Sequence, residues 1–396
     1  MKEPKIRFNE FKGEWENIPF SKIMNRVSTS GQAGILPGVE FEDIVSGEGV
    51  LNKDIYQKIC NKHGTLFQNG DILFGKLRPY LKNILLANFE GIAIGDFWVL
   101  RSIENDSKYL YSLVNTDSFM KIANTSSGSK MPRADWNLVS STEFTISPDK
   151  NEQKTIGIFF TTLDAQISAS TSRLASLKQI KAASLQAMFP QEGETVPKLR
   201  FKGFEGEWEK VAIKDIATFS KGRGYSKSDL RVVGIPIILY GRMYTKYEVC
   251  ITNVDTFVNP LPNSIYSLGN EVIMPASGET PEDISCASAI QVRGIILGGD
   301  LNVLRFNIDC YDTTFIALSL SIGKIKKDLS NMAQGKSVVH LHNSDIEKIE
   351  MFIPSFAEQR AIASFFTNLD RQITLQSQRL EKLKQIKAAC LDKMFV

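Results

Sequence analysis

The sequence has few of the residues that build metal centres, disulfide frameworks or membrane spans. Its 396 residues include three histidines and five cysteines, and the cysteines are scattered with no C-x-x-C pair. Such a set favours reduced thiols over disulfides or a zinc knuckle. No run approaches the roughly 18 apolar residues of a membrane helix, and the N-terminus has no apolar core of signal-peptide length. We therefore expect a cytoplasmic protein.

The chain also lacks a strong excess of charge of one sign. Its formal net charge is +3, so any surface for nucleic acid must come from local clusters of basic residues. With 43% hydrophobic and 23% charged residues, the composition is that of a globular protein. The length suits two or three domains, each large enough to bury a core.

Two partial matches to ligand-binding motifs are incomplete. Gly335-Lys336-Ser337 ends like a phosphate-binding loop, but Ser330 stands where the first glycine is required. His340 and His342 lack a third zinc ligand at motif spacing. A nucleotide site and a zinc site are therefore not expected.

Matches to enzyme motifs fail as well. Asp149 and Glu152 superficially resemble the carboxylates of a metal-dependent nuclease, but those converge from neighbouring strands, and this pair fits a helix start better. The stretch "NPLPN" at 259–263 is not the Asn/Asp-Pro-Pro-aromatic loop of an adenine methyltransferase. No serine or cysteine nucleophile motif is present. The sequence indicates a recognition protein without its own active site.

An internal repeat organises the chain. "PKIRFNEFKGEWE" returns as "PKLRFKGFEGEWE", and a 40-residue segment returns with 22 of 40 positions identical. The first pair occupies 4–16 and 197–209, and the second 151–190 and 357–396. The segments between them, 17–148 and 210–354, are much less alike. The chain is therefore a duplication with similar ends and dissimilar middles.

The similar ends are predicted to be long helices. Each has apolar residues at the spacing of one helical face, and each begins after a proline with a predicted capping box, Asp149 with Glu152 and Ser355 with Glu358. A helix of about 30 to 40 residues is roughly 45 to 60 Å long. Both contain "LKQIKAA".

The apolar positions alternate in steps of four and three, which is typical of a coiled-coil seam. Ser170 and Gln376 interrupt this seam at equivalent positions. The expected partner of each helix is its own copy. The alternative is that each helix packs separately on its local domain.

The middle segments are predicted to be mixed α/β folds with many short strands. The stretch 70–101 has short β-rich runs broken by Gly, Pro and Asn. "GIAIGDFWVLR" at 91–101 is similar to "GIILGGDLNVLR" at 294–305. We infer one fold used twice with divergent loops, which suits two different recognition tasks.

Two variable segments, each followed by a "P-x-x-E-Q…I…FF…LD…I…L…LK" helix, resemble the specificity (S) subunit of type I restriction-modification systems. The resemblance covers essentially the whole chain. "GDILFGKLRPYLKN" at 70–83 is similar to a stretch often met in target recognition domains, whereas "LGNEVIMPASGET" at 268–280 departs from it. The second domain is therefore expected to read different bases.

The resemblance implies an α+β protein with a pseudo-two-fold repeat, in which two similar target recognition domains are joined by two long antiparallel coiled-coil helices. The expected segments are recognition domain 1 (1–148), helical region 1 (149–190), a linker (191–196), recognition domain 2 (197–354) and helical region 2 (355–396).

The resemblance further implies a subunit that binds double-stranded DNA and catalyses nothing. Each recognition domain would read one half of a split, asymmetric site, and the helices would set the spacer. Two modification subunits would methylate adenine with S-adenosylmethionine, and two restriction subunits would use ATP and magnesium. No cofactor is expected in this chain. The repeated heptapeptide would give two identical partners the same docking surface.

Basic residues lie among aromatics and glycines in the expected loops, where they can bind phosphates or guanine edges. Lys130 and Lys336, in "SGSKMPR" (127–133) and "AQGKSVVH" (333–340), are the expected phosphate contacts. For any single residue, the alternative is a solvated surface charge. The candidate DNA-contact residues are Lys76, Arg78, Tyr80, Lys82, Ser129, Lys130, Arg133, Lys221, Arg223, Tyr225, Arg242, Lys246, Lys336 and His340.

A second set of residues is predicted for the helices. Those outside the seam, such as Phe160, Phe366, Leu185 and Leu391, are expected to contribute to partner docking. The full set for helix pairing and docking is Phe160, Leu163, Ile167, Leu174, Leu177, Leu185, Phe366, Leu369, Ile373, Leu380, Leu383 and Leu391. The competing hypothesis is a coiled-coil scaffold that bridges two proteins without reading DNA. A chain that is itself a nuclease or methyltransferase is disfavoured by the missing motifs.

Overall fold

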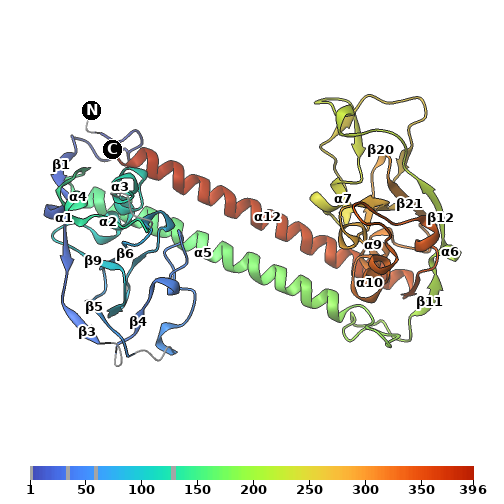
Figure 1. The fold of residues 1–396 in the computed structure, drawn as a ribbon, viewed down its shortest axis with the longest axis horizontal. Helices are drawn as coiled ribbons and strands as arrows, with labels where there is room; N and C mark the ends of the chain where they lie inside the picture. Colours follow the sequence, from blue (N-terminus) through green and yellow to red (C-terminus); the bar gives the residue numbers. More distant parts are fainter. Residues whose placement is uncertain (1–2, 33–35, 58–60, 126–130) are drawn as a thin grey trace. The chain divides into compact units, whose positions relative to one another are not determined.

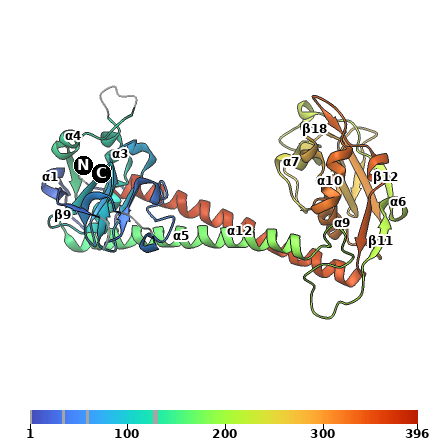
Figure 2. The same cartoon turned by 60° about the horizontal axis from the view of Figure 1, so that its bottom comes forward.

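The computed structural model describes residues 3–32, 36–57, 61–125 and 131–396. The chain divides into two units (Figure 1). Unit 1 comprises Met1–Leu174 with Leu375–Val396, and unit 2 comprises Ala175–Thr374. Two long helices, α5 (Lys150–Ala187) and α12 (Phe356–Met394), are each continuous (Figure 2). Each helix therefore begins in one unit and ends in the other.

Unit 1 contains two four-stranded sheets and a two-stranded one. The first sheet has the order β2 (Met24–Val27), β9 (Phe97–Ser102), β6 (Ile72–Gly75), β7 (Ile84–Leu86). The second has the order β3 (Ser30–Gln32), β5 (His63–Phe67), β8 (Gly91–Ala93), β4 (Gly38–Val39). β1 (Glu16–Pro19) pairs with β10 (Glu143–Ile146). The helices are α1 (Phe20–Ile23), α2 (Ser107–Val114), α3 (Asp117–Ala123) and α4 (Trp136–Ser141), with 3-10 turns η1 (Phe41–Asp43), η2 (Ile55–Gln57) and η3 (Pro79–Leu81).

Unit 2 repeats this plan with a larger first sheet. That sheet has the order β12 (Ala217–Lys221), β21 (Leu301–Phe306), β17 (Glu271–Pro275), β19 (Ser288–Ile290), β14 (Cys250–Ile251). The second has the order β15 (Phe257–Val258), β13 (Ile235–Ile238), β20 (Arg293–Leu297), β16 (Tyr266–Leu268). Two pairs complete it, β11 (Glu209–Ala212) with β23 (Glu350–Ile353), and β18 (Ser277–Gly278) with β22 (Val339–His340). The helices are α6 (Ile213–Ile216), α7 (Arg242–Thr245), α8 (Pro281–Ile284), α9 (Thr313–Leu320), α10 (Gly323–Met332) and α11 (Asn343–Ile346), with the 3-10 turn η4 (Lys227–Asp229).

The core of each unit includes the end of the other repeat's helix region. In unit 1, the ring of Phe395 packs against Trp15, Tyr109 and Phe160 with centroids 5.3 to 6.2 Å apart. Phe395 follows α12, and Ile6 donates a backbone hydrogen bond to Lys393 at 2.9 Å. Both chain termini therefore lie in unit 1 (Figure 2).

Unit 2 has the equivalent cluster. There Phe189, which follows α5, packs against Trp208, Phe315 and Phe366. Leu199 donates a backbone hydrogen bond to Ala187 at 2.9 Å, as Ile6 does in unit 1. The two cores are thus built from equivalent residues of the repeat.

The two helices run antiparallel within each unit. In unit 1, Lys387 of α12 pairs with Asp164 of α5 at 2.5 Å, and the Gln376 amide donates to the Ser170 carbonyl at 3.2 Å. In unit 2, Lys181 of α5 pairs with Asp370 of α12 at 2.5 Å. The expected packing of each helix on its own copy is therefore present.

Each predicted capping box is present only in its first half, in which the cap side chain accepts from the helix backbone. Asp149 caps α5 by accepting from the Asn151 amide at 2.8 Å, and Ser355 accepts from the Glu358 amide at 3.4 Å. Neither glutamate side chain returns to its cap. Glu152 instead accepts from Arg7 at 2.6 and 2.9 Å and from the Trp15 indole at 3.2 Å.

In unit 2, the equivalent glutamate also binds an arginine and does not return to its cap. Glu358 accepts from Arg200 at 2.8 and 2.6 Å. The second half of each predicted capping box is therefore wrong, because a partly buried arginine from the start of the repeat binds the carboxylate.

The glutamine of each "EQ" pair is also internal. Gln153 accepts from the Asp106 amide at 3.0 Å and donates to the Ser147 carbonyl at 2.7 Å. Gln359 accepts from the Asp312 amide at 3.0 Å in the same way. Asp106 and Asp312 are the N-caps of α2 and α9. The repeated motif thus joins the start of α5 to the start of α2, and the start of α12 to the start of α9.

Candidate nucleic-acid interface

In unit 1, the two segments predicted to touch DNA meet in the structure, and in unit 2 the predicted loop 333–340 meets the counterpart of the first segment. In unit 1, the strand-end loop, which we define as residues 76–83 after β6, lies against residues 131–134. Leu77 forms a β-bridge with Arg133, and the Ala134 amide donates to the Lys76 carbonyl at 2.9 Å. The two predicted loops therefore form one surface element.

Unit 2 contains the same junction although its sequence departs from the unit 1 pattern. Ser277 pairs with His340, and the Leu341 amide donates to the Ala276 carbonyl at 3.0 Å. Ala276 and Ser277 follow β17, as Lys76 and Leu77 follow β6. The strand-end loop of unit 2 is accordingly defined as residues 276–280.

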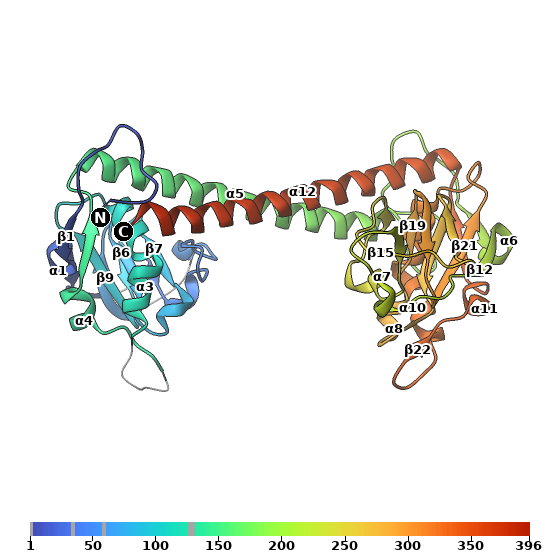
Figure 3. The same cartoon turned by 90° about the horizontal axis from the view of Figure 1, so that it is seen from above.

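The segment 334–340 is a hairpin that presents Lys336. Gln334 and His340 exchange two backbone hydrogen bonds, of 3.0 and 2.8 Å. Gly335 has φ 141°, and a Cβ there would lie 1.9 Å from the Val338 carbonyl oxygen, so only glycine fits. Figure 3 shows the hairpin beside β22, projecting from unit 2 on the side away from α12. The Lys336 ammonium is exposed at its tip.

Four candidate residues are exposed cations without a partner. Within the described ranges, no hydrogen bond or ion pair engages the side chains of Arg78, Lys221, Arg223 or Lys336. Tyr80 is 56% exposed beside Arg78. Such unpaired groups are available to an external anion or base edge.

Other candidates are already paired with acids of their own unit. Lys76 and Arg133 both contact Asp96, at 3.5 and 2.9 Å. Burial of Asp96 opposes its ionisation, but the hydrogen bond and charge of Arg133, assisted by Lys76, hold the pKa of that carboxyl below its usual range. Lys82 pairs with Asp117 at 3.7 Å.

Lys246 is likewise paired, with Asp255 at 2.6 Å. Arg242 is different, because its side chain is only 8% exposed and donates to Glu248 at 2.6 Å. The prediction that Arg242 contacts DNA is therefore wrong. This buried arginine, the first residue of α7, pairs instead with Glu248, whose side chain is partly exposed.

Tyr225 has a structural partner as well. Its hydroxyl lies 2.5 Å from the Ser264 hydroxyl and accepts from the Leu261 amide at 2.7 Å, which ties the loop before η4 to residues 261–264. His340 is exposed, and its ring stacks on His342 with centroids 6.3 Å apart. Ser129 and Lys130 lie outside the described residues.

Sequence reasoning missed a loop that supports the unit 1 site. The Gly47 amide donates to the Lys82 carbonyl at 3.1 Å, and the Ser46 hydroxyl lies 2.6 Å from the Asn83 amide oxygen. Glu48 of the same loop pairs with Lys384 of α12 at 3.5 Å. The signal was "SGEG" at 46–49, whose two glycines have φ of 75° and 66°.

The predicted helix residues fall into three groups. Leu163, Ile167 and Leu369 are buried in the seam. The half-buried residues are Leu174, Leu177, Leu185, Ile373, Leu380, Leu383 and Leu391. Phe160 and Phe366 are 1% and 0% exposed within the cores. The prediction that these two rings contribute to partner docking is wrong, because no partner can reach them.

The exposed apolar residues of the repeated heptapeptide are instead Ile180 and Ile386. They are 50% and 37% exposed and occupy equivalent positions, each preceding the lysine that pairs across the helices. The sequence gave no reason to separate them from the seam leucines, because both sets are apolar.

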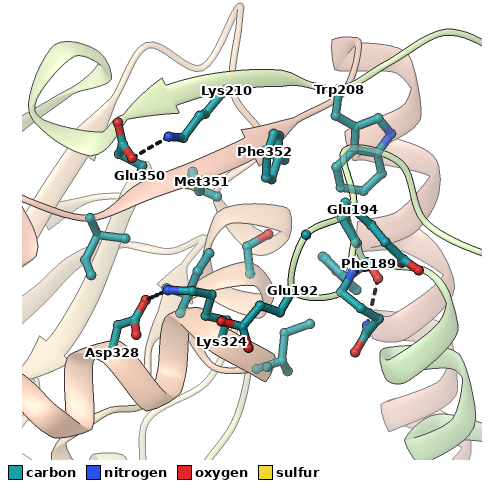
Figure 4. A pocket seen from close by; sticks show the side chains of 18 of the residues that line it. Phe189, Glu192, Glu194, Trp208, Lys210, Lys324, Asp328, Glu350, Met351 and Phe352 are labelled. Atoms are coloured by element: carbon teal, nitrogen blue, oxygen red, sulfur yellow. Dashed lines mark hydrogen bonds and ion pairs between the residues drawn. The ribbon is translucent and has the colours of Figure 1, made fainter.

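Unit 2 also contains a cavity of about 640 Å³ beside the segment that follows α5 (Figure 4). Its walls include Phe189 and Phe352, and its rim includes Lys210 paired with Glu350 at 2.6 Å. None of the predicted DNA-contact residues lines it. Because its charged groups largely pair with one another, nothing in the lining indicates a ligand.

The described ranges contain neither a candidate metal-binding group nor a candidate membrane-spanning helix. No group of three or more His, Cys, Asp or Glu side chains is placed to hold a metal ion. No helix there is long and apolar enough to cross a membrane.

Comparison with known proteins shows what this chain is similar to. Residues 205–385 match the family described as "Type I restriction modification DNA specificity domain". The fold over the whole chain is similar to the S subunit of a type I restriction-modification system from M. genitalium, with a TM-score of 0.65, 15% identity, and 100% and 99% of the two chains covered. At this identity the match concerns the fold alone.

A curated relative extends the match. The type I restriction enzyme MjaVIII specificity subunit of Methanocaldococcus jannaschii is 21% identical over an alignment of length 301 that covers 73% of this chain and 69% of the relative. The resemblance stated from the sequence is thus confirmed, as is the fold class of two recognition domains with coiled-coil helices. Residues 205–385, less than half of the chain, match a type I restriction-modification DNA specificity domain, and the chain as a whole is similar to specificity subunits of that class.

Proposed function

We propose that this chain directs a type I restriction-modification complex to a split, asymmetric DNA site, and that each unit reads one half of it. The observation that carries the proposal is the junction of the strand-end loop with a second loop, present in both units with different side chains. A shared scaffold with unlike loops suits recognition of two unlike half-sites.

We further propose that α5 and α12 set the spacer between the half-sites. Each helix begins in one unit and ends in the other, and 38 residues of α-helix are about 57 Å long. Half-sites on one face of B-DNA recur about every 34 Å per turn. Helix length and spacer length should therefore change together.

Partner docking is the third part of the proposal. Ile180 and Ile386 offer the same exposed apolar side chain at equivalent positions, which suits two identical modification subunits. Substituting both with glutamate should abolish copurification with the modification subunit. Ile158 is 45% exposed on α5 but has a serine, Ser364, at its equivalent position, so Ile158→Glu is the control and should leave assembly intact.

The chemistry is assigned to the partners. In this proposal, modification subunits supply S-adenosylmethionine-dependent adenine methylation, and restriction subunits supply cleavage that uses ATP and magnesium, in the cytoplasm. In this proposal, this chain selects the DNA site and sets the spacing between its halves, and it performs no catalysis.

Methylation mapping tests the proposal. Plasmid DNA from a methylation-free host that expresses this chain with its cognate modification subunit would be sequenced by a single-molecule method. A split motif, methylated in both halves and absent without this chain, is expected. Methylation with the same motif after deletion of this chain would instead favour the bridging scaffold.

A further inference from the structure

Arg78 differs from the other basic residues around the strand-end loop of unit 1. Lys76 and Arg133 are held by Asp96, whereas Lys82 has a long contact, of 3.7 Å, with the exposed Asp117. The Arg78 side chain is exposed, and no hydrogen bond or ion pair engages it within the part of the chain that the structure describes. Its five N–H donors are therefore free for an external acceptor.

The backbone of Arg78 is held in an unusual conformation. Its φ and ψ are 48° and 63°, in the left-handed region that disfavours side chains with a Cβ. Lys82, at the other end of η3, has φ 52°. Left-handed non-glycine residues that persist are held by their surroundings and cluster at functional sites.

The surroundings of Arg78 fix its position. Its amide donates to the Pro132 carbonyl at 2.8 Å, and its carbonyl accepts from the Leu81 amide at 2.9 Å. The following Pro79 is buried, and the Lys82 carbonyl accepts from Gly47. The guanidinium therefore projects from a backbone anchored on both sides.

An arginine that extends from an anchored backbone suits base reading more than phosphate binding. Phosphate contacts need only charge, which flexible lysines provide, whereas a bidentate contact to guanine O6 and N7 needs a planar fork at a defined position. We propose that Arg78 reads a guanine in the half-site recognised by unit 1. This inference rests on the proposed function and adds a specificity-determining residue to it.

Unit 2 carries different chemistry at the same junction. Gly278, which has no side chain, stands at the position of Arg78, and the carboxylate of the next residue, Glu279, is exposed with no partner among the described residues. A carboxylate accepts hydrogen bonds and cannot bond the acceptor edge of guanine. The guanine assigned to Arg78 should therefore have no counterpart read by the same position of unit 2.

The test substitutes Arg78 without disturbing its loop. Arg78→Gly keeps the left-handed backbone, because glycine adopts it without cost, and Arg78→Lys keeps the charge but loses the bidentate fork. Lys82→Gly is the matched control, since Lys82 is basic, left-handed and in the same loop, but its ammonium has no bidentate fork with which to read a guanine.

The complex of each variant would be tested for its methylated motif and for binding to duplexes carrying each base at every position of the unit 1 half-site. Arg78→Gly and Arg78→Lys should relax one guanine position, with about 5- to 150-fold lower discrimination there and no change in the other half. Lys82→Gly should keep the motif.

Two outcomes would overturn the inference. Equal weakening on all duplexes would make Arg78 a phosphate contact, and unchanged binding and motif would place it outside the interface. Both differ from failure of the proposed function, in which the complex with the unaltered chain would show no split motif that depends on this chain.

Discussion

Arg200 and the buried Glu358 form a partly buried ion pair that joins the start of the second repeat to the start of α12. The Arg200 side chain is 16% exposed and that of Glu358 is 2% exposed. Removing one partner of such a pair leaves the other charge uncompensated in the interior. The resulting loss of folding free energy exceeds the net contribution of the pair. The same pair recurs in unit 1 as Arg7 with Glu152.

We expect Arg200→Ala to destabilise unit 2 by about 3–5 kcal/mol in urea unfolding. Lys198→Ala is the control, because Lys198 is 68% exposed and its pair with Glu194 is long, at 3.8 Å, so its effect should stay below about 1 kcal/mol. If the two substitutions changed the free energy of unfolding equally, the Arg200–Glu358 pair would not stabilise unit 2 as described.

The cysteines of unit 2 should differ sharply in reactivity. Burial raises the pKa of Cys286 to about 12, so this side chain stays a thiol at neutral pH, whereas Cys310 is exposed. Because the thiolate is the reactive form, a thiol reagent should modify Cys310 in the folded protein and Cys286 only after unfolding. Peptide mass mapping of the modified sites checks this, and early labelling of Cys286 would contradict the buried environment.

At the scale of elements, the repeated heptapeptide is explained by the pairing of the helices. Its second lysine, Lys181 or Lys387, bonds the aspartate of the "LD" pair on the other helix. Burial raises the pKa of Asp164, and Lys387 opposes this rise. The lysine therefore matters most when the carboxylate is ionised.

We expect Lys387→Met to destabilise unit 1 by about 1–3 kcal/mol at pH 7. A raised folded-state pKa means that protonation of Asp164 favours the fold, so the penalty should shrink as pH falls toward the usual range of a carboxyl group and the acid becomes neutral. Unfolding measured across this pH range, with Lys382→Met on the exposed side of α12 in unit 1 as the control, checks the direction. A penalty that grew on acidification would contradict the assignment.

The elements show what a sequence can predict and what it cannot. Seam leucines such as Leu163 and Leu369 follow from apolar spacing alone, and the two loops could be matched because both precede a long helix. Arg242 could not be placed, because its burial depends on Glu248, which reaches it only in the folded unit. Phe160 and Ile180 are both apolar helix residues, and only the tertiary fold shows that the first is internal and the second exposed.

At the scale of the whole molecule, each unit depends on the chain end of the other repeat. Phe395 belongs by sequence to the second repeat but packs in unit 1, and Phe189 belongs to the first but packs in unit 2. A contiguous half of the sequence therefore lacks part of each core.

Phe395→Ala should lower the free energy of unfolding of unit 1 by about 3–5 kcal/mol, the usual cost of removing a buried aromatic ring. Hydrogen exchange should then accelerate in α2 of unit 1 and stay unchanged in α9 of unit 2. Phe189→Ala should give the opposite pattern, which makes each variant the control for the other. Faster exchange in α9 alone for Phe395→Ala would contradict the described packing.

The central claim is that each unit reads its own half of a split site. The most direct measurement exchanges residues 17–148 for the corresponding segment of another specificity subunit and maps the methylated motif of the resulting complex. The account predicts that one half of the motif changes while the other half and the spacer stay the same. A motif that remained entirely unchanged, or that changed in both halves, would contradict it.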